Sequence, residues 1–73
     1  MNYKQIIDPV IYLQAHFSRQ FMERHKLTPQ EFLELNKKKD IIGFLRIAYE
    51  PLHLTGDEGV LEELDNYVFS ENL

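Results

Sequence analysis

The sequence predicts an all-α fold, a compact bundle of about four helices in one domain that covers residues 1–73. Apolar residues recur every three or four positions in several stretches, which is the spacing of one helical face. Capping residues, two of them followed by proline, mark where helices begin. A chain of 73 residues has room for one domain, and an apolar share of 44% supports a core. We expect helices near residues 9–25, 29–36, 41–50 and 56–69.

Asp8 and Pro9 predict the start of the first helix. Asp can cap the free N–H groups of a first turn, and Pro suits the first helical position because its missing N–H is no loss there. His25 suits the other end, where a cation favours the negative end of the helix dipole. Residues 3–7 fit either a helical turn kinked at Pro9 or an irregular arm. The apolar face consists of Val10, Leu13, Phe17 and Phe21, widened by Ile11 and Met22.

The stretch LTPQEF predicts the start of the second helix. Thr28 is the expected N-cap and Pro29 the first helical residue. Glu31 completes a capping box by reaching back to the Thr28 N–H. Leu27 and Phe32 occupy the two positions of a hydrophobic staple, which fixes the angle at which a chain enters a helix.

A third helix follows because the apolar residues change face. Its apolar stripe consists of Ile41, Leu45, Ala48 and Leu52. If the second and third helices were one continuous helix, the same stripe would extend backwards onto charged side chains. We expect a short break over residues 36–40, with Asp40 capping the third helix. Gly43 costs about 1 kcal/mol relative to Ala inside a helix, which a close helix–helix contact would justify. Pro51 disfavours helical geometry at Glu50, so the helix ends there.

Thr55 and Glu58 predict the start of the fourth helix, since they repeat the capping pattern of the second. Asp57 and Glu58 fall in its first turn, where carboxylates favour the helix dipole. The buried stripe consists of Val60, Leu61, Leu64 and Val68.

The stretch YEPLHLTGDEGVLEEL resembles a metal or phosphate site, because His53 lies among several carboxylates. A zinc site from His53, Asp57 and Glu58 is conceivable, but the same residues are explained by joining two helices, and we favour the second interpretation. There is no cysteine nucleophile, no glycine-rich phosphate loop, and no recognisable Ser-His-acid set. We therefore expect no catalytic, cofactor-binding or metal-binding residues, and no enzyme.

A reducing cytoplasm is the expected location. No run approaches the roughly 20 apolar residues that span a bilayer. Asp8 and Pro9 interrupt the apolar stretch at the N-terminus, which therefore fails as a signal peptide.

Charge is divided unevenly along the chain. Residues 1–49 hold all eight basic residues against five acidic ones, a net charge of +3, whereas residues 50–73 hold seven acidic residues and no Lys or Arg, a net charge of −7. Such polarity can steer a basic partner. It can equally reflect an acidic helix lying against basic helices of the same chain, and both interpretations can hold together.

The fourth helix is the predicted partner-binding element. Glu58, Glu62 and Asp65 form an acidic face on it, and Tyr67 and Phe69 stand near its C-terminus. Aromatic side chains beside charge are typical of binding surfaces. The alternative is a solvated acidic face, with the two aromatics packed on the first helix.

Nucleic-acid binding is the weaker alternative. Helices two and three could form a helix-turn-helix, but the recognition helix over 41–49 would carry Arg46 as its single cation. Lys37, Lys38 and Lys39 could contact phosphate, which positions a protein without specifying sequence. We favour a solvated turn for these lysines. Self-association into a homo-oligomer stays open.

The chain resembles an uncharacterised family of short bacterial helical proteins with the pattern Tyr-x-x-Leu-His-x-x-Gly followed by an acidic helix. The matching residues are Tyr49, Leu52, His53 and Gly56, then Asp65 and Tyr67. The resemblance spans roughly residues 8–69, and Pro51 departs from the pattern. Genes of this family often stand beside genes for ADP-ribosyltransferase-like proteins. The resemblance thus implies a protein partner encoded nearby, with this chain as an antitoxin-like partner of a toxin-like enzyme. It implies no catalytic residues and no role for the four motif residues.

Overall fold

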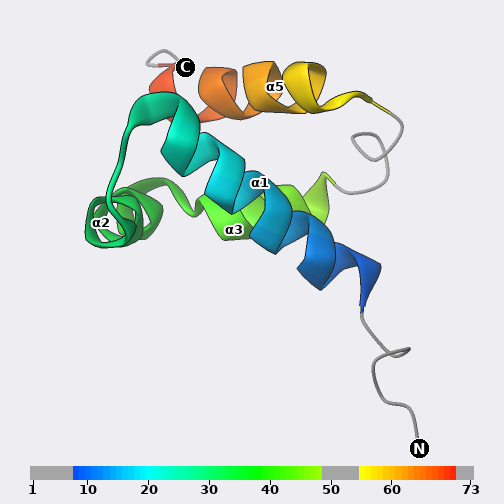
Figure 1. Cartoon of the computed structure of the whole chain (residues 1–73), viewed down its shortest axis with the longest axis horizontal. Helices are drawn as coiled ribbons and strands as arrows, with labels where there is room; N and C mark the ends of the chain where they lie inside the picture. Colours follow the sequence, from blue (N-terminus) through cyan, green and yellow to red (C-terminus); the bar gives the residue numbers. More distant parts are fainter. Residues whose placement is uncertain (1–7, 49–54, 71–73) are drawn as a thin grey trace, which may run out of the picture.

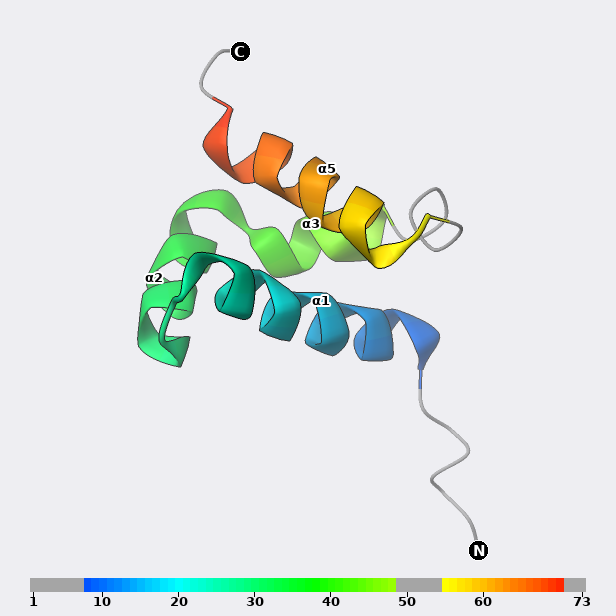
Figure 2. The same ribbon diagram turned by 45° about the horizontal axis from the view of Figure 1, so that its top comes forward.

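The computed structural model describes residues 8–48 and 55–70 of the chain. This part contains four helices, namely α1 (Pro9–His25), α2 (Pro29–Lys39), α3 (Ile41–Ile47) and α5 (Asp57–Phe69). It contains no strand, so the predicted all-α bundle is confirmed. Helices α1, α3 and α5 pack on one another, and α2 lies at the end of this group, between the C-terminus of α1 and the start of α3 (Figures 1 and 2). Within residues 8–48 and 55–70, no helix combines the length and the hydropathy of a membrane-spanning segment.

The core draws side chains from all four helices, as the three apolar stripes and the staple residue Phe32 predict. Val10 is half-buried at the margin, and so is Ala48. Full burial of one large apolar side chain is worth about 1.5–3 kcal/mol. Since α5 supplies four buried side chains, it is anchored along its whole length. The buried set is Leu13, Phe17, Phe21, Phe32, Ile41, Leu45, Val60, Leu61, Leu64 and Val68.

Both predicted N-terminal caps of the first two helices are confirmed. The Val10 N–H donates to Asp8 Oδ1 over 2.8 Å. At α2, the Glu31 N–H donates to Thr28 Oγ1 over 3.1 Å, and the Thr28 N–H donates to Glu31 Oε1 over 2.8 Å. This is the reciprocal capping box expected from LTPQEF, and it fixes the corner between α1 and α2.

The predicted break over residues 36–40 is wrong in extent. Helix α2 continues to Lys39, so the three lysines form its last turn instead of a loop. Asp40 alone separates α2 from α3, with a left-handed backbone at φ 49°. One left-handed residue ends a helix and redirects the chain. Cations in the last turn of α2 also favour the negative end of its dipole, which supports the longer helix.

Asp40 caps α3 as predicted, since the Gly43 N–H donates to Asp40 Oδ1 over 3.1 Å. The structure gives a reason for Gly43 other than the expected helix–helix contact. A Cβ at this position would overlap the Asp40 carboxylate. Gly43 therefore makes room for the cap of its own helix.

Two other helix ends differ from the predictions by a few residues. Helix α3 ends at Ile47 instead of residue 50, with Ala48 in a turn conformation, and residues 49–54 lie outside the described part of the chain. Helix α5 begins at Asp57, because Gly56 and not Thr55 is its N-cap. The capping box predicted for Thr55 and Glu58 is therefore wrong, and the Glu58 carboxylate reaches α1 instead.

Candidate functional site

A row of polar contacts joins α1 to one side of α5. We call it the α1–α5 polar cluster, and it consists of His16, Gln20, Arg24 and His25 on α1 with Asp57, Glu58 and Asp65 on α5. The contacts follow the same order along both helices. The two helices therefore run in roughly the same direction where they meet, which is also visible in Figure 1.

Arg24 is the centre of this cluster. Its Nε donates to Asp65 Oδ2 over 2.9 Å, and its Nη1 donates to Glu58 Oε2 over 3.2 Å. The hydrogen bonds to Glu58 and then to Asp65 raise the pKa of Arg24 above its ordinary value, so its charge is secure. One guanidinium thus binds two carboxylates that lie two turns apart on α5.

Histidines occupy both ends of the cluster. His25 Nε2 lies 2.7 Å from Asp65 Oδ1, and His16 Nε2 lies 3.1 Å from Asp57 Oδ2. Gln20 Nε2 also donates to Asp57 Oδ2, over 3.2 Å. The sequence carried a signal for this row, because His16, Gln20 and Arg24 recur every four residues and so lie on one helical face.

The α1–α5 polar cluster determines which acidic residues of α5 are left exposed. Glu58 and Asp65, two of the three predicted partner-binding acids, contact α1. Glu62, the third, is exposed. Both Glu62 and its neighbour Glu63 lack an ion-pair partner among the described residues. Some of the acidic residues of α5 are therefore paired with α1 of the same chain. Glu62 and Glu63 are the acidic residues of α5 that remain unpaired in this part of the chain.

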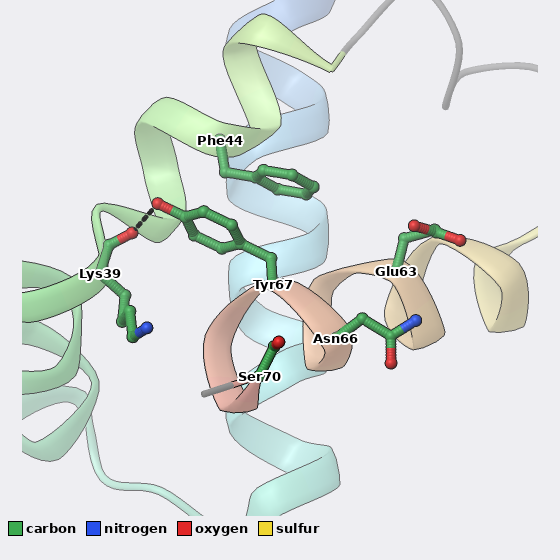
Figure 3. A pocket seen from close by; sticks show the side chains of 6 residues that line it. All are labelled: Lys39, Phe44, Glu63, Asn66, Tyr67 and Ser70. Carbon is green, nitrogen blue, oxygen red and sulfur yellow. Dashed lines mark hydrogen bonds between the residues drawn. The ribbon is translucent and has the colours of Figure 1, made fainter. Parts of the chain in front are cut away.

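An open groove lies where α5 meets α3 and the C-terminal end of α2. Its volume is about 500 Å³ (Figure 3). Phe44 and Tyr67 form its aromatic wall, with ring centroids 4.3 Å apart and planes inclined by 15°. The groove is lined by Lys39, Phe44, Glu63, Asn66, Tyr67 and Ser70.

Tyr67 holds this aromatic wall in place. Its hydroxyl donates to the backbone carbonyl of Lys39, in the last turn of α2. This carbonyl is one of the groups that a helix leaves without an internal partner at its C-terminus. Since Tyr67 also stacks on Phe44, one side chain ties α5 to both α2 and α3. Tyr67 therefore has a structural role as well as a place in the groove.

The rim of the groove is polar and accessible. Glu63, Asn66 and Ser70 are exposed, and their side chains make no hydrogen bond within residues 8–48 and 55–70. Lys39 stands at the opposite end, on α2 (Figure 3). The last turn of α5 contains no basic residue, so its C-terminal carbonyls lack a nearby cation from that helix. The groove thus has a carboxylate at its Glu63 end and an ammonium group at its Lys39 end, toward which the C-terminus of α5 also lies.

Phe69 lies on another side of α5, above the end of α1. Its ring stacks on Phe21 at 6.2 Å and meets the edge of His25 at 5.1 Å. It nevertheless stays 54% exposed. The predicted alternatives for this aromatic therefore hold together, because Phe69 contacts the first helix and also presents an accessible apolar surface.

The other motif residues add little to a site. Gly56 is the N-cap of α5, while Tyr49, Leu52 and His53 lie outside the described residues. In the part of the chain that the structure describes, no group of three or more His, Cys, Asp or Glu side chains could hold a metal ion.

The chain belongs to the DUF3791 family, described as "Protein of unknown function", whose model matches residues 19–70. This match covers α2, α3, α5 and the second half of α1, and so it includes the groove and most of the polar cluster. No curated protein and no solved structure matches the chain.

Proposed function

We propose that this member of the DUF3791 family is a small, non-catalytic protein-binding module of the cytoplasm. In its more specific version, the proposal makes this chain an antitoxin-like partner that neutralises a toxin-like bacterial enzyme. The observation that carries the proposal is the open aromatic groove beside unpaired carboxylates on the outer side of α5.

The proposed binding surface is the side of α5 that faces away from α1. The polar cluster and four buried side chains fix one side of this helix, so its other side is presented in a defined orientation. The exposed carboxylate of Glu63 flanks the stacked pair of Phe44 and Tyr67 there. Aromatic anchors within a polar rim are the usual anatomy of protein interfaces.

The mechanism is occlusion of a basic cleft on the partner enzyme. Glu62 and Glu63 supply the charge that steers the encounter, since complementary charge mainly accelerates association and selects the partner. Tyr67 supplies apolar contact in the groove, and the exposed part of Phe69 supplies it at the edge of this surface, beside α1. Glu58 and Asp65 act indirectly in this proposal, because they hold α5 against α1.

Co-purification tests the proposal. An ADP-ribosyltransferase-like protein of the kind that the family resemblance implies is expressed with this chain, and we expect a stable complex and loss of enzyme activity. Replacing Glu62 and Glu63 together with Gln should weaken the complex several-fold, most strongly at low salt. The matched control replaces Glu23 and Glu34, exposed carboxylates on α1 and α2, and should bind normally. Failure of the two proteins to associate would remove the neutralisation proposal.

A DNA-binding regulator is the second candidate. The corner between α2 and α3 presents exposed Lys37 and Lys38 close to α3, which favours it. Against it, α3 has only seven residues and directs Ile41 and Leu45 into the core, which leaves Arg46 as its exposed cation. A gel-shift titration at increasing salt separates the candidates, because phosphate contacts weaken steeply as salt rises.

A further inference from the structure

We propose that the groove between α5 and α3 receives an arginine side chain from a partner protein. This inference rests on the proposed function and names the anchor that the binding surface takes. The guanidinium lies at Glu63, and the aliphatic part of the arginine lies against the rings of Phe44 and Tyr67.

The acidic end of the groove supplies the charge that an arginine needs. Asn66 and Tyr67 lie three and four residues after Glu63, so both share a face of α5 with it (Figure 3). Within the described residues the Glu63 carboxylate has no ion-pair or hydrogen-bond partner. The C-terminal end of α5 lies toward Lys39, so the negative charge of the acidic end comes from Glu63 itself.

The aromatic wall provides an apolar surface that the aliphatic part of the arginine side chain can contact. Phe44 and Tyr67 are stacked with centroids 4.3 Å apart, and both are half-buried. The bond from the Tyr67 hydroxyl to the Lys39 carbonyl keeps this wall in position before any partner arrives. A preorganised wall lowers the entropy that binding must offset. Cations over aromatic faces also gain from the ring quadrupole.

Lys39 makes the two ends of the groove opposite in charge. It lies across the groove from Glu63 and repels a second cation from its own end (Figure 3). Its ammonium group can donate to a backbone carbonyl of the bound segment. The arginine should therefore enter with its backbone near Lys39 and its guanidinium near Glu63.

Arginine fits this arrangement better than lysine. Its planar guanidinium can bind a carboxylate with two parallel hydrogen bonds and can stack on an aromatic ring. A remaining donor can reach the Asn66 amide oxygen, which lies one turn after Glu63 and also lines the groove. A compact ammonium can satisfy fewer of these acceptors at once.

The test is an NMR titration of the ¹⁵N-labelled full chain with N-acetylarginine amide. The neutral isostere N-acetylcitrulline amide is titrated in parallel. We expect saturable shifts of the Glu63, Asn66 and Tyr67 amides with the arginine probe. The citrulline probe should bind at least about threefold more weakly, which is the effect of losing one exposed ion pair.

A matched pair of variants localises the binding. Glu63→Gln and Glu62→Gln remove the same charge from adjacent exposed positions of α5, but only Glu63 lines the groove. We expect Glu63→Gln to weaken the arginine probe at least about threefold, and Glu62→Gln, which removes only long-range attraction, to weaken it clearly less. Both variants should keep the wild-type melting temperature, which confirms that the fold is intact.

Three outcomes would overturn the inference. Equal binding of the arginine and citrulline probes would remove the role of charge, and equal losses in the two variants would indicate steering by the whole acidic helix. A monomer–dimer equilibrium that Glu63→Gln abolishes in sedimentation would assign the groove to an arginine of a second copy. The proposed function is judged separately, because co-purification with the partner can succeed while the arginine probe fails, and the reverse.

Discussion

Arg24 binds Asp65 through its Nε atom over 2.9 Å, and this contact fastens the end of α1 to the C-terminal half of α5. The same guanidinium holds Glu58 near the start of α5. Because both carboxylates turn toward α1, the opposite side of α5 is the one that faces solvent. An internal ion pair thereby determines which acidic residues are available to a partner.

The first prediction concerns Arg24. Arg24→Ala should lower the midpoint of thermal unfolding, because it leaves Glu58 and Asp65 close together without their shared cation. Arg24→Lys should fall between the wild type and the alanine variant, since an ammonium group cannot match the forked geometry of a guanidinium. The difference between wild type and Arg24→Ala should shrink as salt rises. Arg19→Ala, which removes an exposed arginine of the same helix, is the control. Equal midpoints for the two alanine variants would contradict the central role of Arg24.

The sequence predicted best those features that consecutive residues determine. The bounds of α1 and the start of α2 agree with the structure, because a cap, a proline and an apolar stripe stand next to one another in the chain. Nine of the ten buried residues belong to the predicted apolar stripes, and the tenth, Phe32, was predicted as a staple residue. The bundle could therefore be predicted from local signals alone.

The junction at Asp40 shows where local signals fail. A change of apolar face can be produced by a loop of several residues or by one left-handed residue, and both satisfy the same pattern. The structure takes the second solution. Likewise, Thr55 and Glu58 match a capping box, but Arg24 lies near enough in space to bind the glutamate. Such competition between distant residues cannot be deduced from spacing along the chain.

The groove illustrates the same limit for function. Tyr67 was predicted as a partner-binding residue, but its stacking on Phe44 joins residues 23 positions apart in the sequence. Its bond to the Lys39 carbonyl spans 28 positions. Neither contact follows from the periodicity of α5. The acidic face was predicted from that periodicity, yet the structure divides it between an internal cluster and an exposed side.

The second prediction uses the contact between Gly43 and Asp40. Gly43→Ala would normally stabilise a helix by about 1 kcal/mol. In this chain we expect it to destabilise, because the added Cβ would displace the Asp40 carboxylate from the N-terminus of α3. In an Asp40→Gly background the cap is already absent, and Gly43→Ala should then stabilise by up to about 1 kcal/mol. Urea unfolding of the wild type, Gly43→Ala, Asp40→Gly and the double variant gives the free energies of this double-mutant cycle. The same sign in both backgrounds would show that the cap does not explain Gly43.

The third prediction concerns the centre of the core. Phe21 is completely buried and contacts Phe32, His25 and Phe69. Phe21→Ala should cost about 3–5 kcal/mol, because it removes a large apolar side chain and leaves a cavity. A domain of this size has little more stability than that, so circular dichroism should show a largely unfolded chain at 37 °C. Leu33→Ala provides the contrast, since Leu33 is 55% exposed and its loss should change stability by no more than about 0.5 kcal/mol.

The last prediction separates the two roles of Tyr67. Tyr67→Phe keeps the ring that stacks on Phe44 but removes the hydroxyl that donates to the Lys39 carbonyl. It should lower the free energy of unfolding by about 0.5–1.5 kcal/mol, the net worth of one hydrogen bond. Tyr12→Phe is the matched control, because Tyr12 is 62% exposed and its hydroxyl has no hydrogen-bond partner in the described residues. Urea unfolding measures both variants. A loss confined to Tyr67→Phe supports the hydroxyl as the link between α5 and α2, whereas equal stabilities of the two variants would leave the stacked ring as the whole contribution of Tyr67.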